Sequence, residues 1–325
     1  MDTFTPSDLK TILHSKRANL YYLEHCRVLV NGGRVEYVTD AGQRSQYWNI
    51  PIANTTTVML GTGTSVTQAA MRELAKAGVI VGFCGGGGTP LYSANEIDVE
   101  VAWFNPQSEY RPTQYLQQWV RFWFDDGLRL CAAKTIQRIR LERIEQRWPN
   151  DRTLADGGFA VDKQRLCAAL ADSKRALETA ADNQALLTEE ARLTKTLYKL
   201  AAQAVYYGEF TRAKHGTGTD PANRFLDHGN YLAYGLGATA TWVLGLPHGL
   251  AVLHGKTRRG GLVFDAADLI KDAIILPQAF VSAMRGDDEQ TFRQACIDAF
   301  AQAEALDFII GALQATAEEL GAKAA

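Results

Sequence analysis

The chain has 325 residues, of which 46% are hydrophobic, and a formal net charge of −2 at pH 7. This length fills one large domain or two medium ones, and the composition predicts a fully ordered protein. A membrane protein is excluded, because no stretch approaches the roughly 20 uninterrupted apolar residues of a spanning helix. The N-terminus lacks the pattern of a signal peptide, and the five cysteines form no Cys-x-x-Cys pair. We therefore expect an intracellular protein with reduced thiols.

The first third of the chain predicts a β-rich domain. Alternating and β-branched patterns indicate strands over residues 19–24, 27–31, 34–39, 46–53, 57–60 and 79–83. Gly32 and Gly33 fit a two-residue hairpin turn. The tetrapeptide Ser-Val-Thr-Gln at 65–68 matches a capping box and predicts one short amphipathic helix that ends at Gly78. The glycine run at 85–88 lacks a following Gly-Lys-Ser/Thr and predicts a turn.

Beyond Pro106 the pattern changes to a helical period of 3.6 residues. It predicts helices over residues 115–145, 163–179, 183–207, 230–244, 265–282 and 289–319. The helix over residues 115–145 can bend near Gly127. Residues 151–158 are expected to form a loop. The predicted fold class is therefore α+β with two domains. These are a β-rich N-terminal domain over residues 1–105 and an all-α domain over 106–325 that carries the candidate site.

The stretch 245–272 concentrates side chains that carry chemistry. His254 offers an imidazole, and a helix that begins near Asp265 would present Asp265 and Asp268 on one face of its first turn. One nitrogen and two oxygen donors suit Mg²⁺ or Mn²⁺. A cluster of nearby cations supplies the charge that a nucleic-acid phosphodiester needs, namely Lys256, Arg258 and Arg259.

A structural interpretation of these acids stays open. Asp265 would be the N-cap of a helix, and Asp268 a first-turn acid favoured by the helix dipole. Capping needs only one acid, however, and it calls for neither His254 nor the adjacent cations. The combination therefore favours a functional site.

Basic residues also concentrate in the middle of the chain. Arg192, Lys195 and Lys199 recur at helical spacing and predict one basic stripe beside the acid pair Glu189 and Glu190. Further cations follow at Lys214 and Arg224. A solvated helix face is the alternative to a DNA-binding stripe.

The order of four elements resembles the CRISPR-associated integrase that, with a second Cas protein, inserts new spacers into CRISPR arrays. These elements are Glu190, NRFLDHGNY at 223–231, GLPHGLAVLHG at 245–255 and LVFDAADLIKD at 262–272. The segment GTSVTQAA at 63–70 and the Gly-rich turn with Pro-Leu-Tyr at 90–92 resemble the N-terminal domain of that family. In detail the chain is most similar to subtype I-F members.

The resemblance implies a set of site residues. Glu190, His254 and Asp268 match the metal ligands of the family, with Asp265 as the neighbouring acid. The residues alone do not choose between Glu189 and Glu190. Two further positions match residues that line the same pocket in relatives, although Gly-Asn-Tyr stands here where many relatives have Gly-Tyr: Asn223 and Tyr231.

The resemblance also implies an activity and partners. The expected activity belongs to antiviral defence: a Mn²⁺- or Mg²⁺-dependent endonuclease and integrase that joins 3′-hydroxyl ends of spacer DNA to the CRISPR repeat by transesterification. The expected partners are double-stranded DNA, a second copy of the chain bound through the β domain, and a second Cas adaptation protein, fused to a helicase-nuclease in subtype I-F. The expected location is the prokaryotic cytoplasm. A stand-alone metal-dependent nuclease and a non-catalytic DNA-binding scaffold remain the alternatives.

Overall fold

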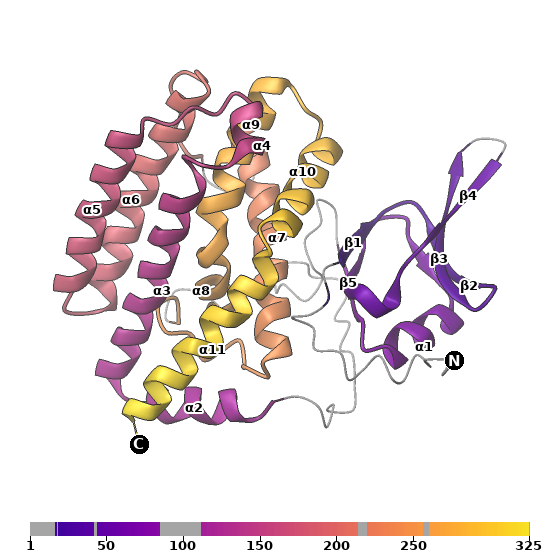
Figure 1. The fold of residues 1–325 in the computed structure, drawn as a ribbon, viewed down its shortest axis with the longest axis horizontal. Helices are drawn as coiled ribbons and strands as arrows, with labels where there is room; N and C mark the ends of the chain where they lie inside the picture. Colours follow the sequence, from indigo (N-terminus) through magenta and orange to yellow (C-terminus); the bar gives the residue numbers. More distant parts are fainter. Residues whose placement is uncertain are drawn as a thin grey trace. The chain divides into compact units, whose positions relative to one another are not determined.

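The computed structural model describes residues 17, 19–41, 44–84, 112–213, 220–255 and 260–324. Contacts divide the chain into two compact units, Met1–Tyr110 and Arg111–Ala325. The first unit holds the strands and one short helix, and the second is helical (Figure 1). The predicted α+β class is confirmed. Among the described helices, none is long and apolar enough to cross a membrane.

The β unit contains two sheets. A three-stranded parallel sheet has the order β1 (Asn19–Leu23), β5 (Thr55–Leu60), β7 (Ile80–Phe83). A four-stranded sheet has the order β4 (Arg44–Asn49), β3 (Arg34–Ala41), β2 (Arg27–Asn31), β6 (Ser65–Val66). A single 3₁₀ turn, η3 (Ile52–Asn54), precedes β5. The core between these elements includes Val28, Val35, Val58 and Leu74, all almost fully buried.

Two local details decide the ends of these elements. Gly32 and Gly33 form the hairpin turn between β2 and β3 with φ of 55° and 79°, as a two-residue primed turn requires. The short helix is α1 (Gln68–Lys76), and its cap is Thr67, whose side chain accepts from Ala70 N at 3.2 Å. The predicted capping box is wrong, because Ser65 belongs to β6, which pairs with β2.

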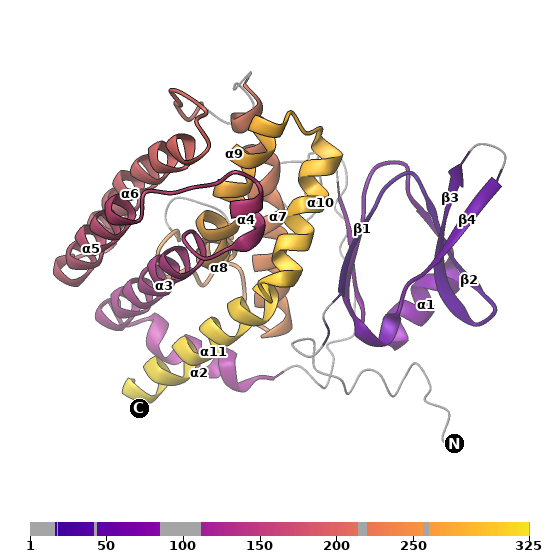
Figure 2. The ribbon, with the colours of Figure 1, turned by 45° about the horizontal axis from the view of Figure 1, so that its top comes forward.

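The helical unit has these elements: α2 (Gln114–Trp123), α3 (Asp126–Arg147), α4 (Arg152–Asp156), α5 (Lys163–Thr179), α6 (Asn183–Ala204), α7 (Pro221–Val243), α8 (Gly261–Ile270), the π-helical turn η4 (Lys271–Ile275), α9 (Leu276–Arg285), α10 (Glu289–Gln302) and α11 (Ala305–Lys323). Figure 2 shows α3, α5 and α6 side by side, and α8 packs against both α3 and α7. The bounds of α5 are those that the sequence predicts.

Several predicted helices begin or break elsewhere. The helix predicted over 115–145 is two helices, because Asp125 caps α3 by accepting from Leu128 N at 2.8 Å. The helix predicted over 289–319 is interrupted at Glu304, which has a φ of 47°. The predicted loop at 151–158 contains α4, which Asp151 caps. The start of α7 lies at Pro221 rather than near residue 230, because Asp220 caps it and proline is favourable in a first turn.

Candidate metal centre

Three residues far apart in the sequence meet inside the helical unit. Glu190 lies on α6, His254 on the loop between α7 and α8, and Asp268 on α8. Each offers one ligand atom, and these atoms lie within 4.8 Å of one another. Glu190 Oε2 is 3.4 Å from His254 Nε2. All three side chains are largely buried, so the arrangement can hold a metal ion away from bulk water.

Glu189 and Glu190 face different neighbours. Glu189 accepts a hydrogen bond from Ser173 Oγ on α5 at 2.6 Å and two from the guanidinium of Arg192, each at 2.7 Å. Adjacent helix residues point about 100° apart around the axis, so Glu190 is turned to the other side, toward His254. The geometry brings Glu190 into the cluster and leaves Glu189 outside it.

Asp265 lies behind the histidine and is not one of the three clustered residues. Its Oδ2 accepts from the N–H groups of Val252 (2.7 Å) and Leu253 (3.1 Å). Its Oδ1 accepts from His254 N at 3.1 Å and lies 2.8 Å from His254 Nδ1. With Nδ1 facing this carboxylate, Nε2 faces Glu190. A carboxylate behind a metal-binding histidine fixes its tautomer and orientation, and Asp265 lies in the corresponding position behind His254.

The acids of α8 are not helix caps. The expectation that a helix begins near Asp265 is wrong, since α8 starts at Gly261 and its N-cap is Gly260 in the left-handed region at φ 66°. Asp265 and Asp268 therefore lie in the helix interior, 0% and 1% exposed. Their spacing of three residues still places them on one face, and neither is the N-cap or a first-turn acid of α8.

Asp268 leaves one oxygen directed at the cluster. Lys271 Nζ donates to its Oδ1 at 2.5 Å. The other oxygen, Oδ2, is buried and finds no hydrogen-bond partner within the part of the chain that the structure describes. Buried polar atoms are almost always paired, so this orphan oxygen fits a cation held together with Glu190 and His254. The donor set of one imidazole and two carboxylates suits a divalent metal ion.

The surrounding charges control protonation at the cluster. Burial by itself would lower the pKa of His254, but its hydrogen bonds to Asp265 and Glu190 outweigh burial and raise that pKa to about 10. Burial would raise the pKa of Glu190, yet the bond to His254 and the cations Arg140 and Lys271 hold it well below its usual range. Without a metal ion, an imidazolium therefore lies between carboxylates at neutral pH.

Arg140 on α3 is a buried cation that no sequence pattern singled out. It donates from Nε to Asp272 Oδ2 at 2.8 Å and again from Nη2. Nη2 also donates to Thr194 Oγ1 at 2.9 Å. Thr194 lies one turn beyond Glu190 on α6, and Asp272 lies in η4, directly after α8. Arg140 therefore links α6, which carries Glu190, to the turn directly after α8, which carries Asp268.

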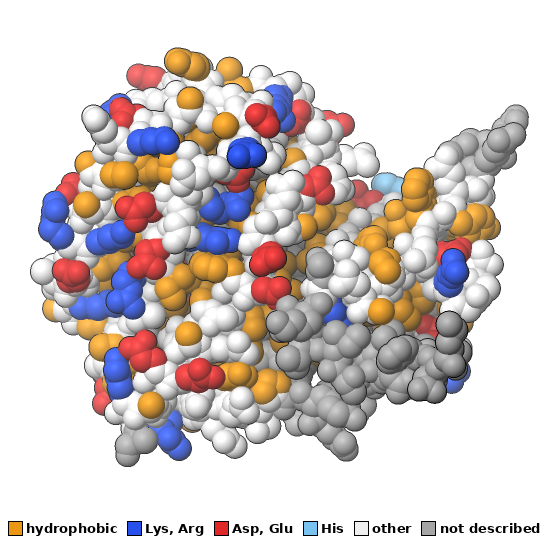
Figure 3. All heavy atoms as spheres, viewed as in Figure 1, with side chains coloured by type: hydrophobic (Ala, Val, Ile, Leu, Met, Phe, Trp, Pro, Cys, Tyr) orange, Lys and Arg blue, Asp and Glu red, His pale blue; other side chains and the backbone are white. Residues whose placement is uncertain are grey.

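The predicted basic stripe lies on the outer face of α6. Arg192, Lys195 and Lys199 are all exposed. At about 100° per residue, they point roughly 140° to 200° around the helix from Glu190, away from the cluster. Figure 3 shows Lys and Arg side chains spread over the helices of this unit with acids among them. Arg224 is exposed on the first turn of α7. The remaining predicted DNA-binding cations lie outside the described residues: Lys214, Lys256, Arg258 and Arg259.

Asn223 is buried at the start of α7 and fastens the preceding segment. Its Oδ1 accepts from Arg212 Nη1 at 2.7 Å and from Ala213 N at 2.9 Å. Its Nδ2 donates to Thr211 O at 3.0 Å and to Asp220 Oδ2 at 2.6 Å. These four bonds show how Asn223 shapes the entry to α7.

Tyr231 contacts a second tyrosine, Tyr234, which the sequence did not indicate. The rings of Tyr231 and Tyr234 meet edge to face, with centroids 5.9 Å apart. Burial tends to lower the pKa of Lys271, but Asp268 and then Tyr234 raise it. Tyr234 therefore lies near Lys271, which donates to Asp268. A second tyrosine one turn after the first was the available signal.

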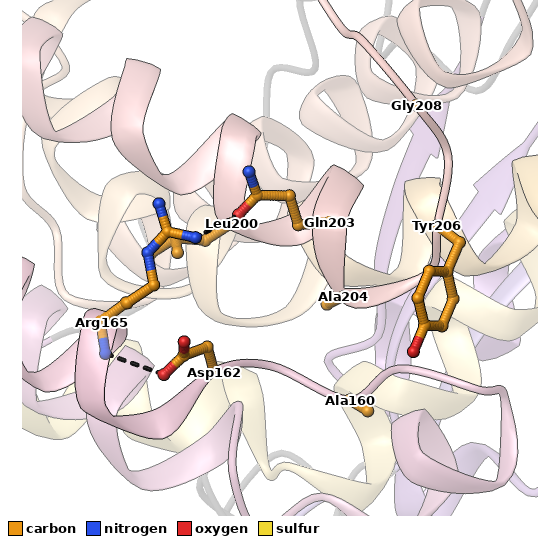
Figure 4. A pocket seen from close by; sticks show the side chains of 8 residues that line it. All are labelled: Ala160, Asp162, Arg165, Leu200, Gln203, Ala204, Tyr206 and Gly208. Atoms are coloured by element: carbon orange, nitrogen blue, oxygen red, sulfur yellow. Dashed lines mark hydrogen bonds between the residues drawn. The ribbon is translucent and has the colours of Figure 1, made fainter.

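A pocket of about 520 Å³ lies elsewhere in the helical unit (Figure 4). Asp162 caps α5 there through Arg165 N at 3.0 Å, and Arg165 Nη1 donates to Gln203 Oε1 at 2.9 Å. Its charged side chains thus already bond to neighbours. No member of the metal cluster lines this pocket, so the candidate site is the cluster. The lining residues are Ala160, Asp162, Arg165, Leu200, Gln203, Ala204, Tyr206 and Gly208.

Comparison with known proteins agrees with the geometry. Residues 20–285 match the family model of the CRISPR associated protein Cas1. The CRISPR-associated endonuclease Cas1 of Pseudomonas aeruginosa (strain UCBPP-PA14) is 74% identical over 318 residues, which cover 98% of each chain.

Two solved structures share the fold. One is a crystal structure of a TtCas1-DNA complex, with a TM-score of 0.61 and 22% identity over 92% of this chain and 91% of that chain. The other is a casposase bound to integration product, with a TM-score of 0.70 and 14% identity over 94% and 91%. The family match spans strands of the β unit and every member of the metal cluster. The chain therefore belongs to the Cas1 family of CRISPR-associated proteins.

Proposed function

We propose that this chain is the metal-dependent DNA endonuclease and integrase of CRISPR adaptation, which joins 3′-hydroxyl ends of new spacer DNA to the CRISPR repeat. The observation that carries the proposal is the convergence of Glu190, His254 and Asp268, with one orphan oxygen, in a member of the Cas1 family. The name of the Pseudomonas relative supports cleavage, and the casposase with its integration product supports joining.

Transesterification exchanges one ester bond for another at phosphorus. The 3′-oxygen forms a new bond to phosphorus and gives up its proton, while the bond from phosphorus to the old ester oxygen breaks. That oxygen leaves and takes up a proton to become a hydroxyl group, and negative charge builds on the phosphate during the exchange. A bound Mn²⁺ or Mg²⁺ supplies Lewis acidity for this charge. Glu190 and Asp268 would hold the ion with His254 Nε2, which Asp265 keeps in orientation. Lys271 adds a positive charge at the edge of the cluster.

The TtCas1-DNA complex supports DNA as the substrate, and we expect it to be double-stranded. Positive side chains would hold its backbone through phosphate contacts, which position the strands without reading sequence. On α6 they would do so on the face opposite Glu190. The proposed contacts are Arg192, Lys195, Lys199, Lys214, Arg224, Lys256, Arg258 and Arg259.

The proposed assembly follows from family membership. The β domain, residues 1–105, would pair with a second copy of the chain, while residues 106–325 form the catalytic domain. A second Cas adaptation protein, fused to a helicase-nuclease, would bind the homodimer. The bacterial relative supports a prokaryotic cytoplasmic location.

A strand-transfer assay with two neighbouring variants tests the activity. Glu190→Gln keeps the shape of the side chain but removes its charge, so joining should fall by about 100-fold or more, as loss of several kcal/mol of charge stabilisation implies. Glu189→Gln is the matched control and should retain joining, since Glu189 faces Ser173 and Arg192. Wild-type joining by Glu190→Gln at saturating Mn²⁺ would rule out the assigned site.

The two alternatives give different results. A DNA end that lacks its 3′-hydroxyl stops an integrase, whereas a stand-alone nuclease continues to cut it. A non-catalytic scaffold would show no Mn²⁺ binding in calorimetry.

A further inference from the structure

The loop that carries His254 is held by side chains from two helices. Three consecutive backbone carbonyls, at residues 250–252, each accept one side-chain hydrogen bond. The donors, in that order, are Trp119 Nε1 at 2.9 Å, Trp123 Nε1 at 2.8 Å and Asn183 Nδ2 at 2.7 Å. The tryptophans lie on α2 and the asparagine begins α6.

The N–H groups of the same loop are also hydrogen-bonded to a side chain. The N–H groups of residues 252–254 all donate to the Asp265 carboxylate. A buried segment outside helices and strands must find partners for its backbone groups elsewhere, and here side chains from α2, α6 and α8 provide them. Close packing adds a further constraint: a Cβ at Gly261 would lie 2.8 Å from Ala251 Cβ and 2.9 Å from His254 O. The position of the His254 imidazole is therefore set by the hydrogen bonds to its loop and by the close packing against Gly261.

The donors are used for their N–H groups and not only for their bulk. Asn183 is not the cap of α6, since Asp182 fills that role. The Oδ1 of Asn183 is buried without a partner among the described residues, so its Nδ2 is the atom in use. Trp119 and Trp123 lie one helical turn apart on α2 and aim their indole nitrogens at successive carbonyls.

We propose that Trp119, Trp123 and Asn183 are positioning residues of the metal centre, which fix His254 Nε2 at the distance from Glu190 and Asp268 that a shared cation requires. The inference rests on the proposed metal-dependent function. None of the three belongs to the cluster itself. Residues that orient a ligand typically change metal affinity about 10- to 100-fold when they are replaced.

The test uses the full-length chain and Mn²⁺ alone. Trp119→Phe/Trp123→Phe keeps two aromatic rings but removes both donors, and Asn183→Leu removes the third. In calorimetry, each variant should raise the Kd for Mn²⁺ about 10-fold or more. Amide hydrogen exchange at residues 250–255 should become faster. Strand transfer should recover as Mn²⁺ is increased, which a purely structural defect would not allow. Trp48→Phe, in the β unit, is the control and should leave all three measurements unchanged.

The outcomes separate this inference from the proposed function. A wild-type chain that binds no Mn²⁺ contradicts the metal-dependent function and the inference together. Wild-type binding with unchanged Kd and unchanged exchange in the folded variants contradicts the inference alone. Trp123→Phe by itself, at a half-buried position, and Asn183→Leu decide the matter if the double variant does not fold.

Discussion

The imidazole of His254 has a carboxylate at each ring nitrogen, Asp265 at Nδ1 and Glu190 at Nε2. Such surroundings favour the protonated ring, whereas a histidine that binds a metal ion must be neutral. Metal binding at this site must therefore displace a proton.

The affinity for Mn²⁺ should consequently rise with pH. The pKa of His254 is raised from 6.5 to about 10, so the ring is protonated at pH 7 to 9 in the metal-free chain. The Kd should fall by up to about 10-fold per pH unit in that range, with release of about one proton. Calorimetry in buffers of different ionisation enthalpy measures both quantities, and a Kd independent of pH would contradict the assignment.

The same pKa shift makes the folding stability of the metal-free chain fall as pH rises, whereas the affinity for Mn²⁺ increases. A raised pKa in the folded state contributes stability that is present below the unfolded value of 6.5 and lost as pH rises toward about 10. The metal-free chain should thus melt at a lower temperature at pH 9 than at pH 7.

The residues around the cluster that are close in sequence were predictable, but the choice of the glutamate and the individual contacts of each residue were not. His254, Asp265 and Asp268 stand close in sequence, so residue types alone indicated a site. Whether Glu189 or Glu190 joins them depends on a rotation of about 100° around α6, which residue types do not encode. Arg140 looked like any cation of a helix, because burial is a property of tertiary packing.

At the scale of elements, the helical period predicted where helices lie but not where they change. The helix predicted over 265–282 is a run of α8, η4 and α9. Its π turn precedes Pro277, which has no N–H to bond the preceding turn. One extra residue in a turn hardly alters a hydrophobic pattern, so the π turn is invisible in the sequence. The helix breaks at Asp125 and Glu304 are equally hard to see in the sequence. Each depends on the conformation of a single residue, an N-cap at Asp125 and a left-handed backbone at Glu304.

The ion pair between Arg140 and Asp272 joins these elements, with side chains only 1% and 3% exposed. Arg140→Met leaves a buried carboxylate uncompensated and should lower the free energy of unfolding by about 3 to 5 kcal/mol. Adding Asp272→Leu replaces both charges by apolar groups and should recover most of this loss. Urea unfolding measures both variants. A double variant no more stable than the single one would mean that the pair is not the main interaction of Arg140.

At the scale of the whole molecule, the cluster and the described side chains that contact it belong to one unit, Arg111–Ala325. The two-domain α+β organisation was predictable because the hydrophobic period changes from two to 3.6 residues near Pro106. The π turn and the side-chain hydrogen bonds to the His254 loop depend on the packing of the helices, so the sequence did not predict them.

A fragment of residues 111–325 should therefore bind Mn²⁺ nearly as tightly as the full chain. If the β domain forms the homodimer, the same fragment should be monomeric in light scattering while the full chain is dimeric. A folded fragment that binds no Mn²⁺ would show that the site needs the β unit, and a dimeric fragment would place the dimer interface in the helices.

The charges in and directly around the cluster nearly cancel without any ion. Three cations, Arg140, Lys271 and protonated His254, face the carboxylates of Glu190, Asp265, Asp268 and Asp272. Structural zinc domains, by contrast, take their folding free energy from the metal. A chelator such as EDTA should thus abolish strand transfer by this chain and leave its cooperative thermal unfolding unchanged. A divalent cation would then bind reversibly after the chain has folded.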